Sequence, residues 1–522
     1  MEPSRRHSTP EGHVQETVRV EPHILEYNIG IVETLGSNVF NLNKSEGWVG
    51  KESRKRATTM LQLVVLYKNP LLHTSLSLLL AVTFAFFKFP ILFLHGLQTY
   101  IHPDSQPQSN GLRAAIRRPS TDAYQPLSSK TAAELKKRNK SKDKVDFDEN
   151  NAQIFRLRLD QGHLQSRLFV DQYCVAFTLS FAALSSLLLH RFLDSPKDHG
   201  FFANGAFVPV LLSILSLYMW GTLLVKITFE RSASRRSEKQ LSVVFGVLGL
   251  FLGLLLVPEG VSMVLDFRFV VPVDGFWRVF IAALMGCLAG FLFIPAFRSA
   301  RCFWLGTDQI RCNLSMITCG WFTRMILYAN QVFVMFVALL WITPLAEIFV
   351  NKNYSSSKGG NVKKSGFGEA EKLLGNVGFS PSDFDSFRQW CLLGSGLLQI
   401  VALRPNLQMY LNEALLSWYQ RLHASKVPDL DYSRAKMFLH NHYLCLVVLQ
   451  FLAPSMLVLL FLGLSQIDSL SFGNFPLLSD LLPSFAFFKE AALFLACWVT
   501  FLWALFSSVI LMLHRHCILY VS

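Results

Sequence analysis

Runs of about twenty apolar residues recur along this chain, and they constrain its fold more than any other feature. A transmembrane helix needs roughly 20 mostly apolar residues to cross the hydrocarbon core of a bilayer. Because lipid offers the backbone no hydrogen-bonding partner, each run is expected to be helical. We therefore predict an all-α, polytopic transmembrane bundle of about nine spans, at residues 71–94, 168–192, 202–227, 241–261, 277–297, 325–350, 387–403, 438–464 and 488–513.

The overall composition also indicates a membrane protein. Of the 522 residues, 51% are hydrophobic and only 16% are charged, whereas soluble domains carry about 25% charged residues. The net charge of +13 comes mainly from segments between apolar runs, where membrane topology accounts for it, so nucleic acid is not an expected partner. The nine cysteines form no CxxC pair, and we predict no disulfide framework, metal site or cofactor.

Polar segments divide the chain into four parts. Residues 1–69 form a polar extension that we expect to be largely disordered, and residues 70–97 contain the first span. Residues 98–167 form a charged loop, including ELKKRNKSKDKVDFDENN, that is too poor in apolar residues to build a core. Residues 168–522 are expected to form the multi-span domain.

Lysine and arginine counts in the short loops predict the orientation. The connection after the third run is basic and the C-terminal HRHC is also basic, so both are expected in the cytoplasm. The loop 465–484 contains no lysine or arginine and is expected on the opposite side. The loop after the sixth run shares that side, which makes Asn353, in Asn-Tyr-Ser, a candidate N-glycosylation site. The basic KESRKR before the first run leaves the side of the N-terminus open.

Small residues recur at every fourth position in two of the runs. Gly249 and Gly253 lie in one, and Ala282, Gly286 and Gly290 lie in the next. Since small side chains let helix backbones approach closely in lipid, we predict tight packing at these positions.

Polar side chains inside apolar runs are costly in lipid, so each needs a reason. Interfacial anchoring and interhelical hydrogen bonds are the ordinary explanations, and cation binding by Glu347, three residues after Pro344, is the sharper one. The candidate intramembrane polar residues are Glu347, Asn330, Gln331, His442 and Gln450.

No motif of a membrane enzyme is present. HNH at 440–442 and HRH at 514–516 place histidines at alternate positions, which point to different faces of a helix. HExxH, GxSxG and P-loop motifs are absent from the sequence. We therefore expect no catalytic residues and no enzymatic activity.

The most specific pattern in the chain is FDS…R.W…RP.LQ.YL. Its residues are Phe384, Asp385, Ser386, Arg388, Trp390, Arg404, Pro405, Leu407, Gln408, Tyr410 and Leu411. With DQYCVAFTLSF from 171, GCLAGFLFIPAFRSARCF from 286 and HNHYLCLVVLQFLAPSMLVL from 440, this pattern resembles the transmembrane protein 161 family of eukaryotic multi-pass membrane proteins. The polar extension before Met60 favours a plant-type member, because animal members begin close to their first apolar run.

The resemblance implies no established molecular activity and no catalytic or binding residue. Animal members are associated with stress protection and with regulating excitability, which implies an influence on ion handling. Asp385, Arg388, Arg404, Pro405 and Gln408 are therefore expected to be signature and anchoring residues rather than a known site.

Arg404 and Pro405 end the seventh run. We predict that Arg404 anchors the span by reaching phosphates or helix C-terminal carbonyls, and that Pro405 starts a separate interfacial helix. A sharper alternative is that Arg404 pairs with Asp385 or another acid to lock a gate.

The leading functional expectation is a non-enzymatic regulator or scaffold of membrane processes, in stress response or ion handling. An ion or small-solute transporter or channel is the second, and a polar track converging at mid-membrane would favour it. A membrane-embedded enzyme is the third. The lipid bilayer and other membrane proteins are the expected partners, with no prediction of oligomeric state, and the endomembrane system or plasma membrane is the expected location.

Overall fold

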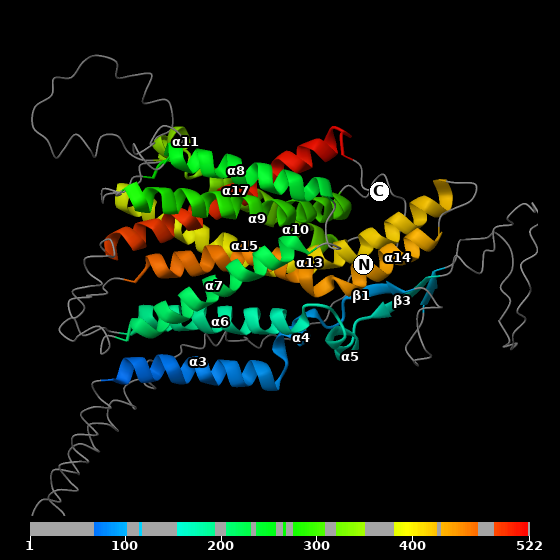
Figure 1. Ribbon diagram of the computed structural model, residues 1–522, viewed down its shortest axis with the longest axis horizontal. Coiled ribbons are helices and arrows are strands. Elements are labelled where there is room, and N and C mark those ends of the chain that lie inside the picture. Colours follow the sequence, from blue (N-terminus) through cyan, green and yellow to red (C-terminus); the bar gives the residue numbers. More distant parts are fainter. Residues whose placement is uncertain are drawn as a thin grey trace, which may run out of the picture. The chain divides into compact units, whose positions relative to one another are not determined.

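The structure is a computed structural model that describes residues 67–101, 114–116, 154–193, 205–230, 236–256, 265–267, 275–307, 320–349, 380–424, 430–467 and 485–519. All of them belong to one compact unit, Tyr67–Ser522. Helices dominate this unit, which confirms the all-α prediction (Figure 1). They are α3 Lys68–Phe86, α4 Phe89–Leu94, α5 Gln161–Gln165, α6 Val170–Phe192, α7 Phe207–Phe229, α8 Arg236–Leu256, α9 Gly275–Thr307, α10 Trp321–Leu339, α11 Thr343–Phe349, α13 Pro381–Ala424, α14 Leu430–His442, α15 Leu444–Ser465 and α17 Phe485–Arg515.

Within the described residues, eight helices are long and apolar enough to cross a membrane: α3, α6, α7, α8, α9, α10, α15 and α17. The remaining predicted span, residues 387–403, lies in α13, which packs against α10 and α15. Arg388, Gln389 and Gln399 lower the mean hydropathy of α13, so it falls outside the eight. The least apolar of the predicted spans is therefore also one of the packed interior elements of the bundle.

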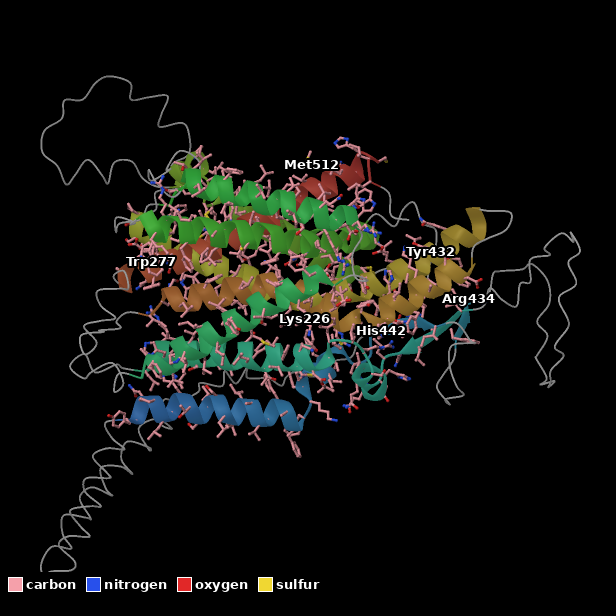
Figure 2. All side chains as sticks on the ribbon, in the orientation of Figure 1. Lys226, Trp277, Tyr432, Arg434, His442 and Met512 are labelled. Atoms are coloured by element: carbon pink, nitrogen blue, oxygen red, sulfur yellow. The ribbon has the colours of Figure 1, made fainter. Side chains whose placement is uncertain are left out.

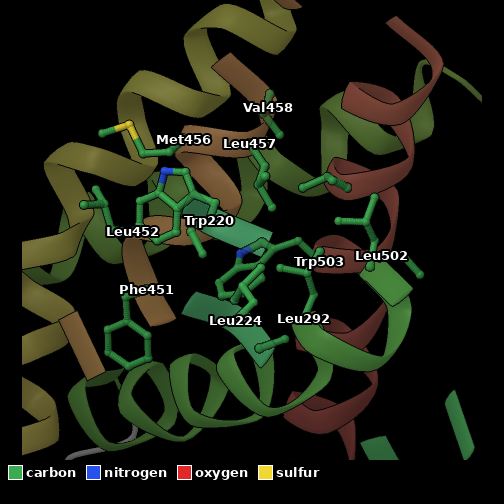
Figure 3. Close-up of a cluster of buried hydrophobic side chains, with 14 of the residues drawn as sticks. Trp220, Leu224, Leu292, Phe451, Leu452, Met456, Leu457, Val458, Leu502 and Trp503 are labelled. Atoms are coloured by element: carbon green, nitrogen blue, oxygen red, sulfur yellow. The ribbon is translucent and has the colours of Figure 1, made fainter. Parts of the chain in front are cut away.

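The core of the bundle surrounds α15. In its most apolar stretch 94% of the residues are buried, against 6% for α3, so α15 is central and α3 is peripheral. Helices α6, α7, α13 and α17 all contact α15. Figure 3 shows how Trp220 of α7, Phe451 and Leu457 of α15 and Trp503 of α17 gather in this core.

Helices α8 and α9 pack through their small residues, as the four-residue spacing predicts. A Cβ added at Gly249 would lie 2.6 Å from the Cβ of Ala289, and one at Gly286 would lie 2.8 Å from the carbonyl oxygen of Gly246. The Ser242 hydroxyl donates across the same interface to the Gly290 carbonyl at 2.6 Å. Backbones this close leave no space for larger side chains.

A three-stranded antiparallel sheet lies at one end of the bundle, within a segment for which no strand was predicted (Figure 1). Its strands are β1 Gln98–Ile101, β2 Ala114–Ile116 and β3 Ile154–Arg158, in the order β1-β3-β2. Such short strands lack a pattern of their own, and β1 is held by α13 and α14, contacts that a local sequence pattern does not contain. Within segment 98–167 the structure describes residues 98–101, 114–116 and 154–167, and the last of these ranges includes α5. The rest of this segment and residues 1–66 lie outside the described part of the chain.

Pro405 does not start a new helix, contrary to the prediction. α13 continues through it for 44 residues, Pro381–Ala424. Proline removes one backbone N–H bond from the helix, but packing on the far side compensates, since Leu407, Leu411 and Leu415 are all buried. The stretch after Pro405 is thus part of the bundle and does not lie as a separate interfacial helix.

Candidate functional site

Buried polar residues follow one face of α13. Arg388, Ser395, Gln399, Asn406 and Glu413 are each no more than 7% exposed. Separations of four and seven residues place their side chains on the same side of the helix. Glycines flanking this stripe set its direction, because Gly394 lies against Phe333 of α10 and Gly396 against Leu459 of α15. The stripe therefore faces the interior between α10 and α15.

An ion pair occupies the stripe at the end of α13 expected outside the cytoplasm. The Arg388 guanidinium donates to the Asp266 carboxylate at 2.8 Å and also to Asp385. It lies over the rings of Trp341 at 4.4 Å and Phe384 at 4.7 Å. The Asp266 N–H donates to the Trp341 carbonyl at 2.8 Å, so three separate segments meet at this arginine. Buried charge is thereby paired and hydrogen-bonded.

Amide side chains lie midway along this face of α13 and on the neighbouring helix α10. Gln399 is 6% exposed, and neither its amide oxygen nor its nitrogen has a hydrogen-bond partner among the described residues. Asn330 of α10 is also buried, and its side-chain oxygen has no partner in the same part of the chain. Gln331 differs, since it donates to the Ser507 hydroxyl of α17 at 2.9 Å.

A second ion pair occupies the stripe at the sheet end of the bundle. Arg301 of α9 donates to the Glu413 carboxylate. One turn earlier on α9, Arg298 donates to Gln450 of α15 at 2.8 Å. Glu413 and Gln450 thus tie α9 to two other helices.

The charges around this second pair keep the Glu413 carboxyl ionised. Burial raises the pKa of the Glu413 carboxyl, but Arg301, with His440 and Lys436, outweighs it and holds that pKa below its usual value. Burial lowers the pKa of His440, although Glu413 opposes the shift. Burial also raises the pKa of Tyr410, whose ring stacks on His440 at 4.7 Å. Glu413 is therefore a carboxylate and His440 neutral at neutral pH.

Three polar residues on a different face of α13 hold strand β1 and the end of α4 that precedes it. Arg404, Gln408 and Asn412 follow a four-residue spacing. Arg404 donates to the His95 carbonyl at the end of α4 at 2.7 Å. Gln408 accepts from the Gln98 N–H at 2.9 Å and donates to the Gln98 carbonyl at 3.1 Å. A glutamine side chain thus pairs with the free edge of β1 as a neighbouring strand would.

The far end of β1 is fixed in the same way. Tyr100 donates its hydroxyl to Asn412 at 3.2 Å, and Asn441 of α14 donates to the Tyr100 carbonyl at 2.9 Å. Thr99 donates to the Asn441 side chain as well. Between α4 and β1, Gly96 has a φ of +83°, and a Cβ there would lie 3.4 Å from the Arg404 guanidinium. We call this set of contacts, which the side chains of Arg404, Gln408, Asn412 and Asn441 make with β1 and with the residues just before it, the strand clasp.

A comparison with known protein families gives a match over part of the chain. Residues 265–477 match the family model described as predicted transmembrane protein 161AB, a segment that contains both ion pairs and every helical residue of the strand clasp. The protein is a multi-pass membrane protein of the transmembrane protein 161 type. No solved structure matches the chain. The family resemblance carried by the motif at 384–411 is thereby confirmed.

The structure of this transmembrane protein 161-type chain brings some of the predicted polar residues together and separates others. Asn330, Gln331 and Gln450 lie in or beside the bundle interior. His442 ends α14, before α15 begins, and its ring stacks on Phe438 at 5.6 Å (Figure 2). Glu347 belongs to α11, but its side chain, like all of Asn353, lies outside the described residues.

The alternative pairing of Arg404 with Asp385 is wrong. Asp385 binds Arg388, whereas Arg404 binds the His95 carbonyl. About 28 Å of helix separates residues 19 positions apart at a rise of 1.5 Å per residue. Of the two kinds of partner predicted for Arg404, the structure contains the helix C-terminal carbonyl.

Among the described residues, no group of three or more His, Cys, Asp or Glu side chains is placed to hold a metal ion. His440 and His442 contact different rings, Tyr410 and Phe438 respectively.

The acidic partners of the buried arginines could not be predicted from the sequence. Asp266 and Glu413 lie 122 and 112 positions from the arginines they bind, and no local pattern links residues so far apart. The strand clasp had a detectable signal, because Arg404, Gln408 and Asn412 repeat every fourth residue beyond the apolar run. A polar stripe on an otherwise buried helix extension predicts a docked polar element.

Proposed function

We propose that the protein moves a small polar solute or ion across the membrane along the polar face of α13. The observation that carries this proposal is Gln399, a buried amide with neither oxygen nor nitrogen bonded among the described residues. A buried polar group without a partner costs about 1–3 kcal/mol, and several in lipid. A solute that supplies the missing hydrogen bonds is a physical reason for such a residue to persist.

Asn330 supports the same position. Its helix α10 packs against α13, and Phe333, one turn away from Asn330, contacts Gly394. The unpartnered Asn330 oxygen therefore lies at a depth close to that of Gln399. Uncharged amides of this kind bind a neutral polar solute or a partly dehydrated ion.

The two ion pairs provide closure at both ends of the polar face. Arg388 with Asp266 and Asp385 occupies one end, and Arg301 with Glu413 occupies the other. Each pair joins α13 to another segment, so separating one pair opens that end alone. This arrangement corresponds to a closed state in alternating access, in which one end opens at a time.

The test is flux across liposomes that contain the purified protein. Potassium, sodium, chloride, radiolabelled urea and radiolabelled glycine serve as probes, with Gln399→Leu as the variant. Leu397→Ala, two residues away and facing lipid at 52% exposure, is the matched control. We expect flux of at least one probe to fall about tenfold in Gln399→Leu and to stay unchanged in the control. Vesicles that are silent with folded wild-type protein would overturn the proposal.

A regulator or scaffold of membrane processes is the second candidate. The observation that favours it is the sheet, whose strand β2 forms an edge of the order β1-β3-β2. An edge strand can pair with a strand of another protein. Silent vesicles together with a protein that binds through residues 114–116 would favour this candidate. Neither candidate is an enzyme.

A further inference from the structure

A groove opens on the surface of the bundle where α6, α13 and α15 meet, with a volume of about 350 Å³. Its long wall is apolar and is made by leucines from all three helices: Leu184, Leu188, Leu393, Leu459 and Leu462. Leu188 is 62% exposed, so this wall faces the surroundings of a membrane-spanning helix. Those surroundings are lipid.

One end of the groove is polar and positively charged. Arg191 lies there in the last turn of α6, beside Gln389 of α13 and Gln466 at the end of α15. Gln466 donates to the Gln389 side-chain oxygen at 3.1 Å, which leaves the Gln389 amide NH₂ as a donor toward the groove. Trp390, 71% exposed, lines the same end. Aromatic and basic residues of this kind are typical of the headgroup level.

The distance between the polar end and the apolar wall suits an amphiphile. Arg191 and Leu184 are seven positions apart on α6, as are Gln466 and Leu459 on α15. Seven residues of helix span about 10 Å, so the groove runs that far from headgroup level into the hydrocarbon.

We propose that this groove binds one phospholipid of the bilayer. Its phosphate accepts hydrogen bonds from Arg191 and Gln389, and one acyl chain lies along the leucine wall. An arginine fork suits phosphate oxygens, and basic pockets between transmembrane helices bind lipid headgroups. The residues that line the groove are not those of the polar face of α13, so a test of lipid binding here does not depend on whether the protein transports a solute.

The experiment uses purified full-length protein in detergent with a limiting amount of phosphatidylcholine that carries a diazirine in its acyl chain. After irradiation, labelled peptides are mapped by mass spectrometry. We expect labels on the peptides of the leucine wall in α6 and α15. Leu393→Trp fills the groove and should reduce this labelling about tenfold. Leu397→Trp, one turn further along the same helix at an exposed position that does not line the groove, is the matched control and should retain it.

The headgroup is tested separately. Arg191→Gln should weaken labelling by phosphatidylcholine, whereas Arg278→Gln, an arginine near the start of α9 that does not line the groove, should not. A diazirine fatty alcohol without phosphate should label the groove less than phosphatidylcholine and be insensitive to Arg191→Gln. Even labelling of α8, α10 and the groove, unaffected by Leu393→Trp, would mean annular lipid only and overturn the site. Absence of label from the groove would also overturn it.

Discussion

Individual charged residues in this bundle are held by long-range partners. In the Arg301–Glu413 pair Glu413 is buried and Arg301 is partly buried, and Glu413 stays ionised because Arg301, His440 and Lys436 outweigh the cost of burial. Breaking a buried pair by removing one partner costs about 3–5 kcal/mol, since it leaves a charge uncompensated. Burial lowers the pKa of the neighbouring His440, so the fold favours its neutral form.

Acidification should destabilise the protein through His440 first and Glu413 second. The pKa of His440 is held below its ordinary value of 6.5. The contribution of neutral His440 to the free energy of unfolding is therefore complete above pH 6.5 and declines below it. The pKa of Glu413 is also depressed, so its contribution is present above its ordinary value of 4.5 and is lost as pH falls further. Thermal unfolding in detergent at about pH 7.5 and about pH 5.5 measures the first effect. His440→Phe keeps a ring against Tyr410 and should reduce the difference between the two midpoints; an unchanged difference would contradict this assignment.

Elements in the bundle are joined by two kinds of contact, small-residue packing and side-chain hydrogen bonds to backbone. The first joins α8 to α9, where backbones meet directly at Gly249 and Gly286. The second is the strand clasp, where α13 and α14 supply the pairing that β1 would otherwise obtain from a strand. Both leave little freedom to the elements involved.

Gly249→Ala should destabilise the protein by about 1–3 kcal/mol, the usual effect of overpacking. The new Cβ would lie 2.6 Å from the Cβ of Ala289, a distance that forces the helices apart. Gly221→Ala in α7 is the control, because a Cβ there meets nothing within 4 Å. Reversible unfolding of both variants checks the prediction. Equal stability of the two proteins would show that α8 and α9 do not pack this closely.

Gln408→Leu should release β1 while leaving the helices intact. The Gln98 N–H and carbonyl would lose their partners, so backbone amides of β1 should exchange about tenfold faster, as expected for roughly 1.4 kcal/mol. Hydrogen exchange with mass spectrometry measures this. Gln408→Glu keeps the acceptor and loses the donor, and should give an intermediate rate. Unchanged exchange in Gln408→Leu would exclude a role for the clasp in holding the strand.

At the largest scale, the described unit that begins at Tyr67 has two different ends. One has the Arg388 pair and the polar end of the groove, and the other has the sheet, the strand clasp and the Arg301–Glu413 pair. Figure 2 shows Trp277 at the former end and Arg434 and His442 at the latter. Loop charges predict that the sheet end faces the cytoplasm.

Cysteine labelling checks this orientation. Cys517, exposed just after α17, should react with a membrane-impermeant maleimide applied from the cytoplasmic side. A Ser380→Cys variant, just before α13, should react only from the opposite side. Each is made in a background whose other cysteines are replaced by serine. The reverse pattern would invert the predicted topology.

The sequence by itself determined the features that repeat within a single helix. Apolar runs predicted the helical bundle, and the four-residue spacing of small residues such as Gly249, Gly253 and Gly286 predicted close packing at those positions, because each pattern lies within a single helix. Only the tertiary structure decided which residues meet across the chain. Arg388 reaches Asp266 and Arg301 reaches Glu413 across more than a hundred positions. The unbroken course of α13 through Pro405 and the β1 strand depend on such contacts too, since packing overrides their weak local preferences.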